Sequence, residues 1–207
     1  MKQVPKKEVR SAARYYHPVK ENNGEDHISS PCFTFRTFLS PGECDDLIEW
    51  SEGYNLLNGS ILTSKDLDVV KNFRDSKVGW LPVEKFSWLY DRIYESVIKT
   101  NYWEYDVNGF YDQIQFSEYD GTITPSFYNT HRDTGPGFHH RKISFVILLN
   151  DPEDFSGGEF NLSTTGKILL TKGSAVMFPS FIEHRVHPVT KGKRYSLVAW
   201  ISGPKLK

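Results

Sequence analysis

The sequence predicts a mostly β protein of the sandwich or jelly-roll type, with its helices confined to the N-terminal half. From Tyr111 onward, short runs of branched and aromatic residues alternate with Gly, Pro, Asn and Asp, a pattern typical of all-β domains. Helical periodicity is found only before that point. Aromatic residues make up 14% of the chain, which suits a β-rich fold with an aromatic-walled interior.

The first predicted helix, residues 40–53, has signals at both ends. Ser40 can cap it, Pro41 suits its first turn, and Glu43 completes a capping box. Gly53 ends it. The inner face is expected to contain Cys44, Leu47, Ile48 and Ser51.

A second helix is predicted to begin at Pro82, because apolar residues follow at helical spacing. These residues are Phe86, Leu89, Tyr90, Ile93 and Val97. Strands are expected at 32–39, 112–119, 141–150, 157–163, 166–171, 174–180 and 194–202. Gly157 and Gly158 indicate a tight turn or bulge, and residues 191–193 (Lys-Gly-Lys) indicate a charged hairpin turn.

The expected domain organisation is simple. Residues 1–30 are polar and without a sustained period, which predicts a loosely ordered arm. Residues 31–207 are expected to form a single domain, with helical support at about 40–100 and a β core at about 111–202. The two cysteines make no disulfide framework and fit a reducing compartment.

Charge and hydropathy argue against several classes of partner. The formal net charge of −1 gives no reason to expect binding to nucleic acid or to an anionic membrane. The N-terminal segment lacks the apolar stretch of a signal peptide, and the aliphatic run 145–149 is far too short to span a bilayer. A cytoplasmic protein is therefore expected.

The sequence FYNTHRDTGP, residues 127–136, contains a His-x-Asp pair, His131 and Asp133. Alternate residues of a strand share a face, so one strand can present both side chains to a metal ion. His184 follows much later, and a strand from a facing sheet is expected to bring it to the same point. Two imidazoles and one carboxylate on one face of the ion describe the facial triad of non-haem Fe(II) oxygenases.

Arg194 follows His184 on a later strand-like run. A dicarboxylate that chelates iron at its oxo-acid end leaves its second carboxylate in a low-dielectric pocket. A permanently protonated guanidinium can bind that carboxylate in bidentate fashion. Ser196 lies on the same strand face and can donate its hydroxyl to the same carboxylate. His-x-Asp, His and Arg-x-Ser therefore form one cooperating set.

Over most of residues 33–202 the sequence resembles the Fe(II)- and 2-oxoglutarate-dependent dioxygenases, especially their prolyl 4-hydroxylase-like branch. The most specific motif is HRVHPVTKGKR, together with the upstream YNTHRDTG and RKISFVILLNDPEDFSGGEF. The resemblance implies a double-stranded β-helix (jelly-roll) core braced by helices. It also implies Fe(II), 2-oxoglutarate as cosubstrate and O₂, with ascorbate as a further candidate. The implied reaction hydroxylates a C–H bond and releases succinate and CO₂.

By this resemblance, the iron ligands are His131, Asp133 and His184. Arg194 anchors 2-oxoglutarate, and Tyr119 matches a tyrosine that faces the 2-oxoglutarate pocket. Tyr128 matches a tyrosine near the substrate, and Trp200 matches a tryptophan packed near the iron. The chain departs from the oxygen-sensing prolyl hydroxylases at Leu148, where these have a tyrosine that helps to hold the distal carboxylate. The departure leaves open which residue is the second anchor.

Other polar residues near these motifs are weaker candidates. Arg132 is expected to point away from the metal, either into a substrate groove or to solvent. His139 and His140 are candidates for substrate contact or for additional metal binding, but a solvated loop explains both more simply. His187 would face away from His184 on an extended strand and is expected to be structural.

The leading functional hypothesis is hydroxylation of a peptidyl residue, most simply proline, whose ring suits aromatic side chains beside the iron. A peptide needs an open groove, and the segments 55–78 and 120–127 are expected to border it as flexible elements. The alternative is a free amino acid or another small molecule, clamped by Arg132, His139 or Arg141. A non-catalytic jelly-roll binding module is disfavoured because the ligand set is complete. Base oxidation in nucleic acid is disfavoured because the basic surface is missing.

Overall fold

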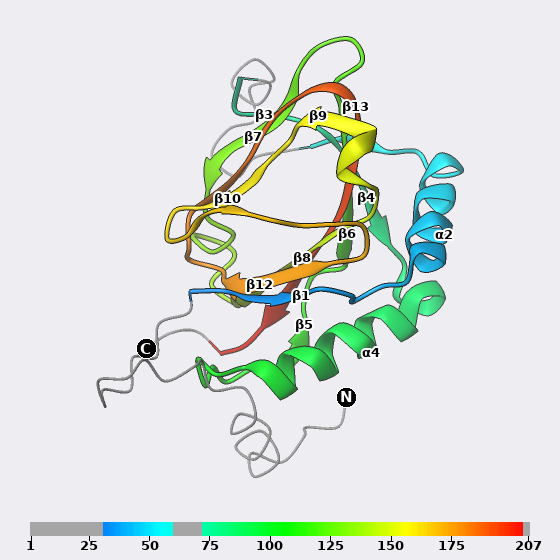
Figure 1. Cartoon of the computed structure of the whole chain (residues 1–207). Coiled ribbons are helices and arrows are strands. Elements are labelled where there is room, and N and C mark those ends of the chain that lie inside the picture. Colours follow the sequence, from blue (N-terminus) through cyan, green and yellow to red (C-terminus); the bar gives the residue numbers. More distant parts are fainter. Residues whose placement is uncertain (1–30, 60–71, 205–207) are drawn as a thin grey trace.

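The computed structural model describes residues 31–59 and 72–204 (Figure 1). Its core is a double-stranded β-helix, so the predicted jelly roll is confirmed. Two antiparallel sheets face each other and share one long strand, β13 (His184–Ser202). The predicted N-terminal arm, residues 1–30, lies outside the described residues.

The major sheet is built on the C-terminal half of β13, residues 193–202. On one side of it lie β8 (Arg141–Leu148), β12 (Ala175–Pro179) and β1 (Phe33–Phe35). On the other side lie β6 (Ile114–Asp120), β4 (Lys77–Leu81) and β2 (Leu57–Asn58). The short strand β5 (Gly109–Phe110) pairs with the end of β13.

The minor sheet is built on the N-terminal half of β13, residues 184–192. Its other strands are β7 (Ser126–His131), β3 (Arg74–Asp75), β9 (Phe155–Gly157), β10 (Phe160–Leu162) and β11 (Gly166–Ile168). A short 3₁₀ turn, η1 (Pro152–Asp154), precedes β9.

The hairpin turn predicted at residues 191–193 is wrong, because β13 continues through this segment into the major sheet. Gly192 has a φ of 68°, and a Cβ atom at this position would clash with the carbonyl oxygen of Asp154. The glycine therefore permits a close backbone approach within an irregular strand, and the chain does not reverse there.

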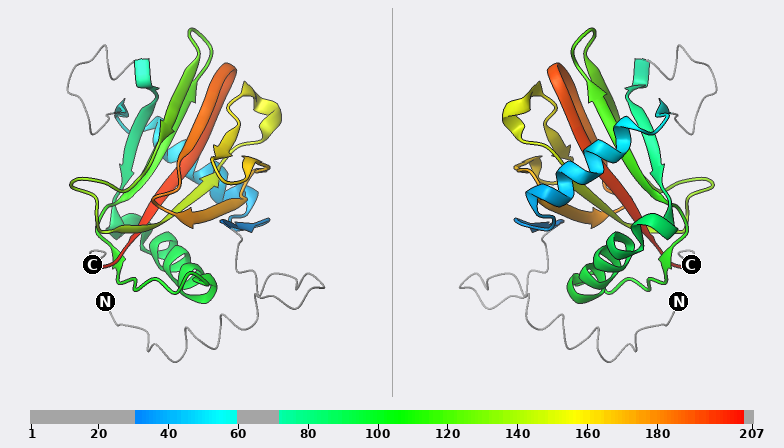
Figure 2. Two further views of the ribbon diagram at one scale, coloured as in Figure 1. Left: turned by 90° about the vertical axis from the view of Figure 1, so that its left-hand side faces the viewer. Right: turned by 90° about the vertical axis from the view of Figure 1, so that its right-hand side faces the viewer.

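Two helices, α2 (Pro41–Glu52) and α4 (Val83–Thr100), cover the outer face of the major sheet (Figures 1 and 2). The capping box of α2 forms as predicted: the Glu43 amide donates to Ser40 Oγ at 3.2 Å, and the Ser40 amide donates to the Glu43 carboxylate at 2.9 Å. The predicted apolar stripe of α4 is entirely buried. Neither helix is long and apolar enough to cross a membrane, nor is any other in the described ranges.

The strands β8 and β13 divide their side chains between two cores, as the period of a strand requires. Their outward side chains pack against the helices; these are Ile143, Phe145, Ile147, Leu197, Ala199 and Ile201. Their inward side chains face the space between the sheets. On β13 these are Arg194, Ser196, Val198 and Trp200, and all four line one cavity.

The segment 55–78 was expected to border the substrate groove as a flexible element, and its described part contains β2, β3 and the start of β4. β3 pairs with β7 and places Arg74 opposite Tyr128. Two-residue strands such as β2 and β3 show no periodicity in the sequence. Their conformation is set by distant partners, which a local pattern does not reveal.

The ion pair between α2 and α4 predicts a pH-dependent contribution to stability. Arg92 donates two hydrogen bonds to the Glu43 carboxylate, at 3.0 and 2.7 Å. These bonds lower the pKa of Glu43 from 4.5 to about 2. Because the pKa is lowered in the folded state, the stabilisation is present above the ordinary pKa and is lost as the pH falls through the folded-state value.

We expect Glu43→Gln to lower the free energy of unfolding at pH 7, measured by urea denaturation. Glutamine can still form the capping box, so the substitution isolates the charge. The difference between the two proteins should shrink steadily as the pH is lowered below about 4.5. A difference that stays constant down to pH 3 would contradict this assignment.

Candidate active site

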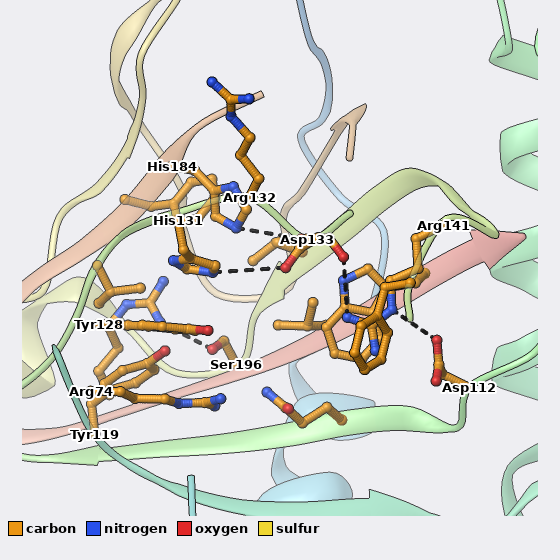
Figure 3. Close-up of a pocket in the computed structure, with 18 of the residues that line it drawn as sticks. Arg74, Asp112, Tyr119, Tyr128, His131, Arg132, Asp133, Arg141, His184 and Ser196 are labelled. Carbon is orange, nitrogen blue, oxygen red and sulfur yellow. Dashed lines mark hydrogen bonds and ion pairs between the residues drawn. The ribbon is translucent and has the colours of Figure 1, made fainter. Parts of the chain in front are cut away.

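A cavity of about 330 Å³ opens between the two sheets (Figure 3). Its lining combines aromatic and aliphatic side chains with an unusual number of charged ones. The charged residues are Arg74, Asp112, Arg132, Asp133, Arg141 and Arg194, with two histidines beside them. Such a cavity is suited to a polar or charged ligand.

Three side chains converge in this cavity, those of His131, Asp133 and His184, and their ligand atoms lie within 4.8 Å of one another. Asp133 Oδ1 lies 3.7 Å from His131 Nε2, and Asp133 Oδ2 lies 3.4 Å from His184 Nε2. Figure 3 shows the carboxylate directed toward both imidazoles. The group can hold one metal ion.

The route by which these residues meet differs from the expectation in two respects. His184 does not come from a facing sheet, because β7 and β13 are antiparallel neighbours and His184 lies opposite His131. β7 ends at His131, so Asp133 lies just beyond the strand and not within it. Strand pairing across more than fifty residues leaves no local trace in the sequence.

Both imidazoles are oriented by backbone carbonyl groups. His131 Nδ1 lies 2.8 Å from the Asn129 oxygen, and His184 Nδ1 lies 2.9 Å from the Ile182 oxygen. When Nδ1 carries the proton and donates it, Nε2 is left unprotonated and can bind a metal. The ring of Tyr128 stacks on that of His131, with 3.5 Å between their centroids, and fixes its plane.

The charge states of His131 and Asp133 are those that metal ligands need. Burial, together with the nearby His184, lowers the pKa of His131 to about 3, so this imidazole is neutral at neutral pH. Burial alone would raise the pKa of Asp133, but the two histidines and a hydrogen bond from Ser144 lower it overall. Ser144 Oγ donates to Asp133 Oδ2 at 2.6 Å. Two imidazoles and one carboxylate fit Fe(II).

Arg194 lies in the same cavity and is only 2% exposed. Its Nη1 donates to Ser196 Oγ at 3.0 Å, and the ring of Tyr119 lies 5.5 Å from the guanidinium. Within the described ranges, no carboxylate lies at ion-pair distance from Arg194. A buried charge without a partner is strongly destabilising, so this arrangement favours binding of an anion.

Some of the remaining predicted site residues line the cavity and others lie outside it. Trp200 lines the cavity and covers the guanidinium of Arg141 at 3.7 Å. Arg132 lies at the rim, where its side chain is 59% exposed and pairs with Glu183 at 2.9 Å. His140 does not line the cavity, and neither does any residue of the segment 120–127, which was expected to border its mouth.

Three cavity residues gave little or no signal in the sequence. Asp112 accepts hydrogen bonds from Arg141 and pairs with His140, and it comes just before β6. Arg74 is 6% exposed and lies 4.4 Å from the ring centroid of Tyr128. Arg141 was considered only as a clamp for a small molecule. Neither Asp112 nor Arg74 stands in a recognisable motif, so only their spatial neighbours reveal them.

Comparisons with known proteins agree with this geometry. Residues 114–202 match the 2OG-Fe(II) oxygenase superfamily. A PKHD-type hydroxylase of Gloeothece citriformis is 26% identical over 176 residues, covering 82% of this chain and 77% of the relative. The matched residues include His131, Asp133, His184 and Arg194 of the candidate site. This chain is a 2-oxoglutarate-dependent dioxygenase, and its cofactors are Fe(II), 2-oxoglutarate and O₂, as predicted.

Further relatives of this oxygenase are similar over shorter or more divergent stretches. A PKHD-type hydroxylase of Hyphomonas neptunium is 44% identical over 62 residues, which are 28% of this chain and 28% of the relative. Among solved structures, a prolyl-4-hydroxylase of Pseudomonas putida is 17% identical with a TM-score of 0.64, covering 84% of this chain and 93% of that chain.

A prolyl hydroxylase solved with a hypoxia inducible factor peptide fragment, from Trichoplax adhaerens, is 16% identical to this oxygenase with a TM-score of 0.70, covering 84% of both chains. At this level of identity, the solved structures show the shared fold.

Proposed function

We propose that this oxygenase hydroxylates a residue within a peptide, with proline as the target, and releases succinate and CO₂. The observation that supports a peptide substrate is that the side chains expected to clamp a free amino acid are either already paired or outside the cavity. The two arginines that could clamp a free amino acid are already paired: Arg132 with Glu183 and Arg141 with Asp112, each at 2.9 Å. The third candidate, His139, is exposed and does not line the cavity.

In this proposal, His131, Asp133 and His184 hold the metal. Fe(II) bound there, with 2-oxoglutarate and O₂, supplies the oxidising chemistry that hydroxylates a C–H bond. The chain's own part is to keep both Nε2 atoms free and the carboxylate ionised. Ser144, which bonds Asp133 Oδ2, restrains the direction of that carboxylate.

Arg194 and Ser196 bind the distal carboxylate of 2-oxoglutarate in this proposal. Ser196 lies opposite Leu148 on β8, the position at which the resemblance leads us to expect a tyrosine. The serine hydroxyl therefore occupies the neighbourhood of the missing anchor. Burial raises the pKa of Tyr119, so its hydroxyl stays protonated and can donate to the same ligand.

Gly158 leaves the space in which Arg194 lies. Its φ is +69°, and a Cβ atom there would lie 2.9 Å from Arg194 Cδ. Gly158 is not part of the cavity lining, so an added methyl group would push the guanidinium toward the ligand. We expect Gly158→Ala to raise the apparent KM for 2-oxoglutarate roughly fivefold to tenfold. The effect should be smaller than complete loss of the buried charge pair, which costs ~2–5 kcal/mol, because the guanidinium is displaced and not removed.

Gly166→Ala is the matched control for this substitution. Gly166 has a φ of +74°, and no atom lies within 4 Å of the position of its Cβ. It therefore imposes a similar backbone strain without a contact, and its KM should be unchanged. Equal effects of the two substitutions would mean that strain alone acts, and the role of Gly158 would be rejected.

The proposed function is tested by succinate release with Fe(II), 2-oxoglutarate and proline-containing peptides, free amino acids and oligonucleotides in parallel. A proline peptide should raise succinate release above the uncoupled background, with a gain of one oxygen on proline by mass spectrometry. Free proline should be much poorer. The reverse ranking, with a free amino acid above every peptide, would replace the peptide hypothesis by the small-molecule alternative.

A further inference from the structure

Asp133 lies where the pairing of the minor sheet has already ended, since the last residue of β7 is His131. The backbone amide of Asp133 donates to the backbone oxygen of Ser180 at 3.0 Å. Ser180 follows directly after β12, in the turn that leads to β13. The position of Asp133 therefore depends on this turn.

The same turn supports a second candidate ligand. The Ile182 amide donates to the Pro179 oxygen at 2.9 Å, which closes the turn, and the Ile182 oxygen lies 2.9 Å from His184 Nδ1. The Ser180 amide donates to the Lys142 oxygen at 2.9 Å, which ties the turn to the major sheet. One short segment thus fixes the places of two of the three groups that can hold the metal.

The side chain of Ser180 also reaches Asp133, through Ser144 on β8. Phe178 on β12 lies opposite Ser144, and Ser180 comes two residues later. Ser180 Oγ lies 3.0 Å from Ser144 Oγ, and Ser144 Oγ lies 2.6 Å from Asp133 Oδ2. The two hydroxyls and the carboxylate form one chain of hydrogen bonds.

The direction of donation along this chain follows from the chemistry of a hydroxyl group, which has one proton to donate. Ser144 donates its proton to the Asp133 carboxylate. The hydrogen bond between the two serines is therefore donated by Ser180. Hydrogen bonds in a chain polarise one another, so the Ser180 hydroxyl strengthens the bond from Ser144 to Asp133.

The two serines act on the cavity from outside it. Ser144 is 0% exposed and Ser180 is 1% exposed, and neither lines the cavity. They are therefore not placed to touch a substrate or cosubstrate bound there. The chain of hydrogen bonds carries the influence of the Ser180 hydroxyl to the site through Ser144 and Asp133.

We propose that Ser180 is a positioning residue of the metal site. Its hydroxyl holds Ser144 in the orientation that donates to Asp133, and so fixes the direction of the carboxylate that binds the metal. Partners that orient a metal ligand typically change metal affinity ~10–100-fold when they are removed. The inference rests on the proposed metal ligands and extends the site to a residue outside the cavity.

The test compares the binding of Co(II) to the metal-free protein, measured by calorimetry, in the original chain and in serine variants. Ser144→Ala removes the direct bond to the carboxylate and should weaken binding at least about tenfold. Ser180→Ala removes the outer donor and keeps the backbone bond to Asp133. It should weaken binding roughly threefold to fivefold, the effect of one lost hydrogen bond.

A double-mutant cycle separates positioning from a general loss of packing. Because Ser180 acts through Ser144, Ser180→Ala should cost no further Co(II) affinity when Ser144→Ala is already present. The visible absorption spectrum of bound Co(II) should change in both single variants, and the double variant should have the spectrum of Ser144→Ala. Additive losses of affinity would show that the two serines act independently, which would overturn the proposal.

The matched control is Ser174→Ala, at the opposite end of β12. Ser174 is also buried, at 4% exposed, and its hydroxyl bonds the Thr171 backbone at 2.8 Å within its own turn. Both alanine variants lose a buried hydroxyl, so their stabilities should fall by similar amounts. Ser174→Ala should nevertheless keep the original Co(II) affinity and spectrum. Equal losses of affinity in the two variants would reject the role of Ser180.

Ser180→Cys carries the test if Ser180→Ala does not fold. Its side chain has a similar shape but a weak S–H donor, so it too should bind Co(II) less tightly than the original protein. Unchanged affinity in the folded Ser180 variant overturns the positioning role, and the metal ligands stand if Asp133→Ala loses Co(II) binding. If Asp133→Ala binds Co(II) as tightly as the original protein, the ligand assignment fails and this inference fails with it.

Discussion

Asp133→Ala is expected to abolish 2-oxoglutarate turnover while leaving the fold intact. Asp133 supplies the only carboxylate among the three ligand groups that converge in the cavity, and without it two imidazoles remain. Iron bound by two histidines alone loses its anionic ligand, so affinity for the metal should fall together with activity. Succinate release and calorimetric titration with Fe(II) under anaerobic conditions measure the two effects.

The fold should survive because the carboxylate contributes little packing. Its removal costs one hydrogen bond from Ser144, worth about 1 kcal/mol, and Ser144 keeps Ser180 as a partner at 3.0 Å. Asp45→Ala is a suitable control, since Asp45 is largely exposed and pairs with Lys172 on the surface. Full activity of Asp133→Ala would show that the metal ligands have been assigned wrongly.

Arg194→Ala is expected to raise the apparent KM for 2-oxoglutarate at least tenfold. Loss of one partner of a buried charge pair costs on the order of 2–5 kcal/mol, and Arg194 is 2% exposed with no acidic partner among the described residues. Ser196→Ala removes a single hydrogen bond and should cost about 1 kcal/mol. Steady-state kinetics with 2-oxoglutarate as the varied substrate give both values.

Arg194→Lys separates charge from geometry. Lysine keeps the positive charge but not the planar fork, so its KM should lie between those of the original protein and Arg194→Ala. Metal binding should be unchanged in Arg194→Ala, Arg194→Lys and Ser196→Ala, because neither Arg194 nor Ser196 is among the metal-ligating residues. Unchanged cosubstrate binding in Arg194→Ala would reject the anchor.

The helices were predictable because their signals are local. The capping box at Ser40 and Glu43 and the buried stripe of α4 depend on residues three or four apart. The strands β2 and β3 were missed because each is two residues long and depends on a partner far away in the sequence. Local patterns therefore predicted the supports of the fold better than the strands at its edge.

The candidate site shows the same division. Arg194, Ser196 and Trp200 stand at alternate positions of one strand, so the sequence alone groups them. Asp112 was missed because its partners Arg141 and His140 are 29 and 28 residues away and no motif joins them. The expectation that His184 reaches the site from a facing sheet was wrong for a related reason, since the pairing of β7 with β13 becomes visible only in the structure.

Because both sheets share β13, the arrangement of the cavity side chains depends on the length of a single segment of this strand. His184 lies in the half of β13 that belongs to the minor sheet, whereas Arg194 and Trp200 lie in the half that belongs to the major sheet. Insertion or deletion of one residue between His184 and Arg194 would reverse which side chains of the second half point inward. Tyr195 and Leu197 would then face the cavity, and the guanidinium and the indole would leave it together. Nine residues separate His184 from Arg194. Metal binding by His184, cosubstrate binding by Arg194 and the position of Trp200 in the cavity therefore all depend on the length of this segment. A change of its length would disturb all three together, and we expect it to be tolerated less well than a substitution.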